Sequence, residues 1–305
     1  MKPKVTLGVC VKNAARTLEQ TTKCIVNQDF PVDLMEVIFV DDGSQDNTFQ
    51  IIQKFALTEG VKTRIIHRGW KGLGRSRNDV VDNAEGDYIV WVDGDMILPS
   101  DYVRKQVEFM ERNPAVGIAK GKYLLLPSNN LTGTLEIYSR AAEKMADLNK
   151  TSSKALGTGG AIYRLSTVKK VKGFDDTLTG YGEDWDIENR IRSAGWLLRT
   201  TDSQFQDLER LGITYTQLWL RYTKRGHDLY FFYQKNKALI RLYKMLPFAG
   251  ILTGFLGSIK VYKQIQRKTV FLLPVHNMFK LTAWYVGFIE SHFDSKAPLS
   301  PLVKV

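Results

Sequence analysis

Two acidic motifs in the chain have the residue types and spacing needed to bind a charged substrate. Asp93–Gly94–Asp95 follows the apolar run Gly86–Val92, and Asp41–Asp42 follows Val37–Val40. Alternate carboxylates at the end of a strand could hold a hard divalent cation against a diphosphate. A solvated acidic turn would explain either motif alone, but two such motifs at adjacent strand ends favour a single nucleotide site.

The elements that would position these carboxylates alternate between apolar strands and amphipathic helices. The expected strands are Val5–Val11, Val37–Val40, Thr63–Ile66, Tyr88–Val92, Gly117–Leu126 and Ala161–Tyr163. The expected helices are Ala14–Gln28, a segment after Asp46, Leu73–Asn83, Asp101–Arg112, Leu131–Leu148 and Asp184–Ser193. This alternation is typical of an α/β fold with a mainly parallel sheet and helices on both faces. Ligands of such sheets bind beyond the carboxyl ends of the strands, where Asn13 and both acidic motifs fall.

Composition excludes several protein classes. The chain of 305 residues is 44% hydrophobic and 25% charged, as in globular proteins rather than disordered or fibrous ones. Cys10 and Cys24 have neither the spacing of a zinc site nor the number of a disulfide framework. This use of cysteine favours an intracellular, reducing compartment, and we see no secretion signal before the first expected strand.

The net charge of +11 is concentrated at one end of the chain. Residues 1–220 carry 29 basic and 29 acidic residues, whereas residues 221–305 carry 14 basic and three acidic ones. The chain is therefore a neutral body with a basic and apolar tail. This distribution favours an anionic membrane surface, and not nucleic acid, as the partner of the tail.

Two apolar segments of the tail are too short or too polar to cross a membrane as helices. Met245–Ile259 is uncharged but has only 15 residues, and Thr269–Ile289 contains His276, Asn277 and Lys280 on one helical face. The cations between the two segments are Lys260, Lys263, Arg267 and Lys268. The pattern favours amphipathic helices in the plane of an anionic membrane. A helical pair packed on the body, or forming a dimer, is the alternative.

The order of the motifs resembles that of the inverting glycosyltransferases of family 2, which have the GT-A fold. The matching pieces are Val9–Asn13, Val40–Ser44, Gly72–Asn78, Gly86–Tyr88, Asp93–Asp95, Gly157–Arg164, Gly173–Asp175, Gly182–Asp186, Arg190 and Gly195. The likeness covers about residues 4–200. It implies a GT-A domain, which we expect over residues 1–230, with residues 231–305 as a basic helical extension.

The resemblance also implies which residues bind the nucleotide sugar and the metal. Nucleotide-sugar contacts are expected from Val11, Asn13, Asp41, Asp42, Arg75, Arg77, Asp93 and Gly94. Asp42 is similar to the residue that accepts a hydrogen bond from the base, uracil or guanine. Asp95, with Asp93, resembles the ligands of Mg²⁺ or Mn²⁺, and His227 is a further candidate ligand. A solvated helix start would also explain the two arginines, and a packing role would explain His227.

Glu183–Asp184 is similar to the acidic pair that supplies the catalytic base in this family. Inverting transfer needs a carboxylate that removes the proton of the acceptor hydroxyl, and we prefer Asp184 to Glu183 for this role. An acidic helix start stabilised by the helix dipole would place the same residues here. Tyr181 and Trp185 favour a site, since aromatic rings stack on sugar faces.

The sequence therefore predicts a metal-dependent glycosyltransferase that uses a nucleotide diphosphate sugar, a UDP- or GDP-sugar. The expected acceptor is a hydroxyl of a lipid-linked or membrane glycan. The expected location is cytoplasmic, peripheral on the inner face of the cell membrane. Two alternatives stay open. One is a synthase that charges a polyprenyl phosphate with one sugar and needs no general base, and the other is a catalytically silent scaffold that binds nucleotide sugars at the membrane.

Overall fold

The computed structural model describes residues 2–124, 128–145, 156–208, 212–235, 237 and 242–294. These residues form two compact units. The first draws on Met1–Leu124, Thr151–Thr179 and Glu183–Leu208, and the second on Leu125–Lys150, Gly180–Gly182 and Glu209–Val305. The ends of the predicted strand at Leu126 and of the predicted helix at Leu148, and residues 295–305 of the extension, lie outside the described residues.

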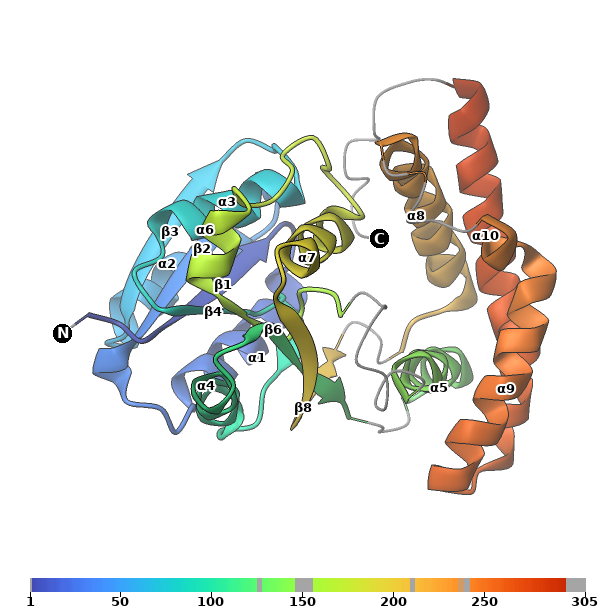
Figure 1. Ribbon diagram of the computed structural model, residues 1–305, viewed down its shortest axis with the longest axis horizontal. Coiled ribbons are helices and arrows are strands. Elements are labelled where there is room, and N and C mark those ends of the chain that lie inside the picture. The colour runs from blue at the N-terminus through green and yellow to red at the C-terminus, as the bar shows by residue number, and fades with distance from the viewer. Residues whose placement is uncertain are drawn as a thin grey trace. The chain divides into compact units, whose positions relative to one another are not determined.

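An eight-stranded sheet forms the centre of the first unit (Figure 1). Its strands are β1 Val5–Val11, β2 Met35–Asp42, β3 Lys62–Arg68, β4 Tyr88–Trp91, β5 Met96–Ile97, β6 Val116–Tyr123, β7 Ala161–Arg164 and β8 Leu197–Asp207. In space they follow the order β3-β2-β1-β4-β7-β6-β8-β5. The pairs among β1 to β4 are parallel, as the sequence predicted, whereas β7 runs antiparallel to both β4 and β6. The sheet is therefore mixed.

The reversed direction of β7 places a glycine-rich loop at the edge of the sheet where ligands are expected. Because β7 begins where β4 ends, the loop Gly157–Gly160 lies at the carboxyl end of β4. The Gly160 N–H donates to the Trp91 carbonyl at 2.9 Å. This loop is thereby fixed next to Asp93, the residue that follows the strand by two positions.

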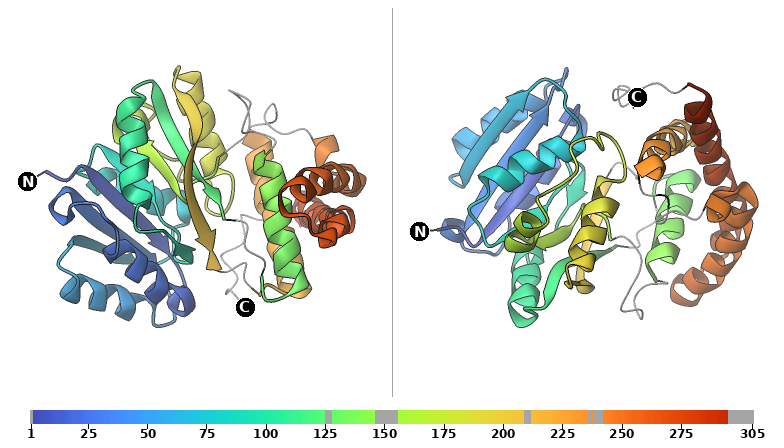
Figure 2. Two further views of the ribbon diagram at one scale, coloured as in Figure 1. Left: turned by 90° about the horizontal axis from the view of Figure 1, so that it is seen from below. Right: turned by 45° about the horizontal axis from the view of Figure 1, so that its top comes forward.

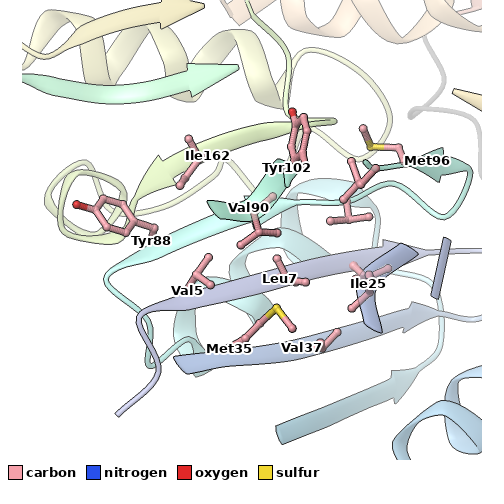
Figure 3. Close-up of a cluster of buried hydrophobic side chains, with 14 of the residues drawn as sticks. Val5, Leu7, Ile25, Met35, Val37, Tyr88, Val90, Met96, Tyr102 and Ile162 are labelled. Atoms are coloured by element: carbon pink, nitrogen blue, oxygen red, sulfur yellow. The ribbon is translucent and has the colours of Figure 1, made fainter. Parts of the chain in front are cut away.

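Helices cover both faces of this sheet (Figure 1). One face carries α1 Ala15–Val26, α2 Thr48–Thr58 and α4 Tyr102–Arg112, and the other carries α3 Leu73–Asn83, α6 Leu165–Lys170 and α7 Glu183–Ser193; the short helix η1 Val32–Leu34 precedes β2. Figure 3 shows part of the first cluster, in which Leu7 and Val90 of the strands lie with Tyr102 of α4. Neighbouring strand residues face opposite ways, since Phe39 joins the first cluster and Ile38 the second. The predicted α/β architecture is confirmed.

The described elements of the second unit are all helical. They are α5 Leu131–Met145, α8 Tyr215–Lys235, η4 Leu242–Met245, α9 Pro247–Ile265, η5 Lys268–Leu272 and α10 Leu273–Asp294. α10 runs along both α8 and α9, as both views of Figure 2 show. Glycines allow this close approach: a Cβ atom on Gly226 of α8 would overlap the Trp284 carbonyl of α10, and one on Gly287 would overlap the Thr223 carbonyl.

Helix α9 turns its small residues inward and its large apolar residues outward. Gly250 and Gly254 lie against the backbone of α10, and Gly257 lies against Ala142 of α5. The large exposed residues of this helix are Phe248, Ile251, Leu252, Phe255, Leu256 and Ile259. Among the helices that the structure describes, none combines the length and the apolar character needed to cross a membrane.

A buried charged cluster connects α10 to α5. Lys280 Nζ lies 2.8 Å and His276 Nε2 lies 3.3 Å from Glu136 Oε2. Arg140 Nε donates to Glu136 Oε1 at 3.2 Å. Burial alone would raise the pKa of Glu136, but Lys280, His276 and Arg140 hold it well below its usual range. The polar face predicted for this segment is thus buried within the unit, because Glu136 compensates its charge.

Substitution of Gly226 by alanine tests whether backbone contact holds α8 and α10 together. The added Cβ meets a carbonyl oxygen rather than a side chain that can rotate away, so we expect a loss of about 3 kcal/mol or more in the free energy of unfolding. Gly69→Ala is the control, because nothing lies within 4 Å of a Cβ there and the backbone has no positive φ. Urea unfolding of the full chain measures both; equal stability of the two variants would contradict the expectation.

Candidate active site

Hydrogen bonds between side chains and backbone join the segments at the carboxyl ends of β1 and β2. Asp41 is fully buried, and its Oδ1 accepts hydrogen bonds from the Ser44 hydroxyl and, at 3.1 Å, from the Ser44 N–H. His67 Nδ1 lies 2.9 Å from Asp41 Oδ2. Asn13, at a φ of 51°, donates its N–H to Ser44 Oγ at 2.9 Å and accepts from the Gln45 N–H at 2.8 Å. Asp41 and Asn13 therefore shape the turn at this edge of the sheet.

Asp42 fixes the loop that follows β3. Its Oδ1 accepts from Arg68 and, at 2.9 Å, from the Lys71 N–H, and its Oδ2 accepts from the Gly72 N–H at 2.9 Å. A carboxylate offers about four acceptor positions. Three donors among the described residues fill three of them, and Oδ2 accepts from one of these donors only.

Arg75 belongs to a network centred on Asp79 of α3. Its Nη2 lies 2.7 Å from Asp79 Oδ1, and its Nη1 lies 3.4 Å from Asp176 Oδ2. Arg68 Nη2 reaches the other oxygen of Asp79 at 2.8 Å. The guanidinium of Arg75 thus has carboxylate partners in Asp79 and Asp176, with Asp82 Oδ2 a third at 3.7 Å, and its contact with a nucleotide stays a prediction.

The loop Gly157–Gly160 brings Asp93 and Asp184 close to the same short segment. A Cβ atom on Gly159 would overlap Asp93 Oδ2, and one on Gly157 would lie 3.3 Å from Asp184 Oδ2. Gly157 also has a φ of 74°, which favours glycine. Asp93 is exposed and Asp184 is half-buried, so a ligand can reach both carboxylates.

Arg77 joins three segments that are far apart in the sequence. Its Nη1 forms an ion pair with Glu183 Oε1, and its Nη2 donates to the Thr158 hydroxyl. The guanidinium also lies 5.5 Å from the ring centre of Phe174 and 5.9 Å from that of Trp91. Both members of the ion pair are buried.

The charges around this pair shift the pKa values of both groups. Burial raises the pKa of Glu183 to about 7, against the effect of Arg77 and with that of the neighbouring charge on Asp184. Burial would lower the pKa of Arg77, but Glu183, Asp184 and Asp93 hold it above its usual value. Arg77 is therefore a cation shared by three predicted site carboxylates.

Asp95 and Gly94 are held from two sides. The Thr17 hydroxyl donates to the Gly94 carbonyl at 2.7 Å, and the Leu208 N–H donates to the Asp95 carbonyl at 2.6 Å. Gly94 lies so close to Val11 that a Cβ atom would stand 2.8 Å from the valine Cγ1. The backbone of the predicted metal motif is thus fixed, with Asp95 buried and Asp93 exposed.

Two carboxylates fit a metal ion whose coordination a substrate completes. Asp93 and Asp95 offer the hard oxygen ligands that Mg²⁺ and Mn²⁺ prefer. Within the part of the chain that the structure describes, no group of three or more His, Cys, Asp or Glu residues could hold an ion. Mg²⁺ commonly binds one or two carboxylates together with substrate phosphates, so this donor set suits a shared site.

His227, the third predicted ligand, lies on α8 in the second unit. Its Nδ1 is 3.7 Å from Asp228 Oδ1, and its ring centre is 5.4 Å from that of Phe231. Its role as a metal ligand stays a prediction.

Sequence reasoning missed several residues that fix the site. They are Arg68, Lys120, Thr158 and Glu188. Glu188 accepts the Gly157 N–H at 2.6 Å, and Lys120 Nζ donates to the Gly157 carbonyl at 3.2 Å. Glu188 lies four residues after Asp184 on the same helix, a spacing that could have indicated a shared face. Lys120 gave no such signal, because it stands inside an apolar strand.

Comparison with known protein families gives two matches. The family model described as glycosyl transferase family 2 matches residues 6–167, and the model described as glycosyl transferase family group 2 matches residues 88–289. A poly-β-1,6-N-acetyl-D-glucosamine synthase of Staphylococcus epidermidis is 23% identical over 226 residues, which cover 71% of this chain and 53% of the synthase. The chain thus spans about half the length of that relative.

Solved structures share the fold. A mannosyltransferase, PcManGT, from Pyrobaculum calidifontis in complex with GDP-Man and Mn²⁺ has a TM-score of 0.67 at 16% identity, covering 97% of this chain and 89% of the other. Residues 1–349 of TarS from Staphylococcus aureus in complex with UDP have a TM-score of 0.52 at 16% identity, covering 96% and 92%. At this level of identity the likeness shows the fold alone.

Replacing Arg77 tests the buried ion pair through its dependence on pH. Glu183 binds its proton more tightly in the folded chain than in the unfolded one, where the pKa is near 4.5. The contribution of this tighter proton binding to the free energy of unfolding is therefore complete below pH 4.5. It is lost as the pH rises through about 7 and Glu183 loses its proton in the folded chain. Arg77→Met removes the cation that compensates the buried carboxylate once Glu183 is ionised. We therefore expect the free energy of unfolding to fall only slightly at acidic pH and by roughly 3–5 kcal/mol at alkaline pH.

Urea unfolding at an acidic and an alkaline pH measures this difference. The double variant Arg77→Met with Glu183→Gln is the control, because it lacks the titrating carboxyl and should lose the added pH dependence. An equal destabilisation by Arg77→Met at both pH values would show that the charge of Glu183 does not depend on Arg77.

Proposed function

Because the chain belongs to glycosyl transferase family 2, we propose that it catalyses metal-dependent, inverting transfer of a sugar from a nucleotide diphosphate sugar to an acceptor hydroxyl. The family gives the reaction class, glycosyl transfer from nucleotide sugars. The observation that carries the proposal is the convergence of Asp93, Asp184 and the Arg77–Glu183 pair on the loop Gly157–Gly160.

Asp42 supports the recognition of a UDP- or GDP-sugar. The acceptor position on its Oδ2 that no described donor fills suits an N–H donor of the base, either uracil or guanine, and the Arg68 contact fixes the carboxylate. Solved structures of the same fold have been obtained with GDP-Man and with UDP, so both bases are known in this architecture.

Asp93 and Asp95 are the proposed ligands of Mg²⁺ or Mn²⁺. When bound there, the ion supplies Lewis-acid stabilisation to the leaving nucleoside diphosphate. The exposed Asp93 is reachable by the donor phosphates, while Asp95 is buried with its backbone fixed. The mannosyltransferase of the same fold was solved with Mn²⁺, which agrees with this assignment.

Asp184 is the proposed general base, and Glu183 is proposed to position it. Asp184 is half-buried and open to an acceptor, whereas both oxygens of Glu183 are buried and one is bound by Arg77. Asp184 would take the proton of the acceptor hydroxyl as the oxygen attacks the anomeric carbon from the face opposite the leaving group. Arg77 interacts electrostatically with both carboxylates, and it is proposed to position them without contacting the acceptor.

A lipid-linked or membrane glycan is the proposed acceptor, reached from an anionic membrane surface. The exposed apolar residues of α9 form one support for this location, and the exposed cations Lys260, Lys263, Arg267 and Lys268 directly beyond them form the other. Each such cation contributes about 1 kcal/mol near an anionic surface, so four of them supply roughly 4 kcal/mol. The proposed location is therefore peripheral, on the inner face of the cell membrane.

The first test of the function is Asp184→Asn. Loss of a general base typically lowers the rate by 10² to 10⁴, so we expect sugar transfer to a hydroxyl acceptor to fall by roughly that factor. The dissociation constant of the donor should stay near that of the unmodified chain. The control is Asp202→Asn, which makes the same chemical change at a side chain that is 99% exposed. Unchanged transfer by Asp184→Asn would reject Asp184 as the base, and lost donor binding would assign it to the nucleotide.

Flotation with vesicles tests the membrane location. The full chain should float with anionic vesicles and less with neutral ones, and replacing Phe248, Leu252 and Phe255 by serine should reduce flotation because these exposed side chains would insert. Leu57→Ser is the control, since Leu57 is 86% exposed on α2. A full chain that stays unbound at low salt, or a triple variant that floats equally well, would contradict a membrane role for α9.

A further inference from the structure

Two buried charged side chains, Lys120 of β6 and Glu188 of α7, hold the backbone where the glycine-rich loop Gly157–Gly160 begins. Lys120 Nζ donates to the Leu156 carbonyl at 2.7 Å and to the Gly157 carbonyl at 3.2 Å. Glu188 Oε2 accepts from the Leu156 N–H at 2.7 Å, and Oε1 accepts from the Gly157 N–H at 2.6 Å. The pair therefore binds all four backbone polar groups of these two residues.

Neutral side chains could bind the same backbone groups at a lower cost of burial. Lys120 is 4% exposed and Glu188 is 1% exposed, and an ammonium or a carboxylate loses more hydration on burial than an amide or a hydroxyl does. The charges add strength, because hydrogen bonds to an ionised group are shorter and stronger than those between neutral groups. A carboxylate that accepts with both oxygens also fixes two amides at once. This arrangement indicates a backbone that must be held in one position.

The backbone that the pair holds lies beside two carboxylates of the proposed active site, and all these residues belong to the first unit. A Cβ atom on Gly157 would lie 3.3 Å from Asp184 Oδ2, and one on Gly159 would overlap Asp93 Oδ2. Asp184 and Glu188 are four residues apart on α7, so they share one side of the helix. One helix therefore carries the proposed base and also holds the loop that lies against it.

We propose that Lys120 and Glu188 are positioning residues for the transfer step. In that step Asp184 takes the proton of the acceptor, the acceptor oxygen bonds to the anomeric carbon, and the bond from that carbon to the nucleoside diphosphate breaks. By holding Leu156 and Gly157, the pair keeps the loop at a fixed distance from Asp184, so that the reacting groups meet in one geometry. The proposal rests on the proposed function, because it assigns these two side chains to that reaction.

Kinetics of the full chain with Mn²⁺ test this role through the difference between rate and nucleotide affinity. The rate probe is whichever of UDP-GlcNAc and GDP-Man the unmodified chain hydrolyses, with water as the acceptor, and UDP or GDP reports on binding. Lys120→Met and Glu188→Gln should each lower kcat by about 10- to 100-fold, because a displacement of reacting groups by about 1 Å has an effect of this size. The dissociation constant of the nucleotide should change by less than about twofold.

A double variant and a control guard against a loss of folding. Lys120→Met with Glu188→Gln removes both charges together, so neither is left buried alone, and it should show the same loss of kcat with the same nucleotide affinity. Lys122→Met is the control, because Lys122 lies two residues further along β6 and is paired with the exposed Asp202. An unchanged kcat, or a nucleotide affinity of the double variant that falls as far as its kcat, would overturn the proposal.

The pH dependence of kcat separates positioning from direct catalysis. The fall in rate at acidic pH should remain in Glu188→Gln, because Asp184 still takes the proton in that variant. Loss of this acidic limb would identify Glu188 itself as the group that titrates in the reaction, and it would overturn the positioning role.

Hydrogen exchange of the Leu156 and Gly157 amides tests the contacts without any activity. Both amides should be protected in the unmodified chain and in Lys122→Met, and they should exchange faster in Glu188→Gln. Rapid exchange of both amides in the unmodified chain would overturn the proposal even if the chain transfers sugar. If the amides are protected but the unmodified chain binds neither UDP nor GDP, the proposed function fails, and the positioning role fails with it.

Discussion

The buried ion pair between Arg77 and Glu183 is the interaction on which the site depends. Arg77 comes from α3, Glu183 from the start of α7, and the Thr158 hydroxyl that also binds Arg77 comes from the loop before β7. These segments are more than 20 residues apart in the sequence, so no local preference could hold them together. Removal of Arg77 would leave the carboxylate of Glu183 buried without its ion-pair partner, and it would also remove the contact with Thr158, so this one side chain joins three segments.

Glycines allow close packing in both units, at the loop before β7 in the first and between helix backbones in the second. In the first unit, glycines in the loop before β7 let the chain pass against Asp93 and Asp184. In the second, Gly226 and Gly254 allow helix backbones to meet, so that α9 buries its small residues and exposes its large ones. A helix packed in this way gains little from burying its own apolar side chains. Those side chains are then available to another apolar phase, which is the physical basis for the proposed membrane contact.

The sequence could predict the strand ends but not the contacts that join them. Apolar runs ending in acidic residues locate Asp42 and Asp93, because parallel strands bring their carboxyl ends to one edge. The direction of β7 was beyond such reasoning, since a short apolar run looks the same in either direction. β8 was missed because Leu197–Asp207 mixes polar and apolar residues without a clear run. The partners of Arg75 and Lys280 also depend on long-range packing, which composition and periodicity do not contain.

The neighbouring carboxylates Glu183 and Asp184 lie in different surroundings, and this difference is the basis for the different roles proposed for them. Glu183 is buried, and the resulting rise of its pKa to about 7 shows that its charge is unfavourable there even beside Arg77. Asp184, one residue later, is half-buried, and its Oδ1 accepts the Trp185 N–H at 2.8 Å. A general base must be open to the substrate so that it can take a proton from it. A carboxylate that fixes a helix through a buried ion pair is closed to the substrate, so one group cannot do both. In the proposed site the ion pair of the buried Glu183 with Arg77 therefore fixes the start of α7, and the half-buried Asp184 is the group that would meet the acceptor.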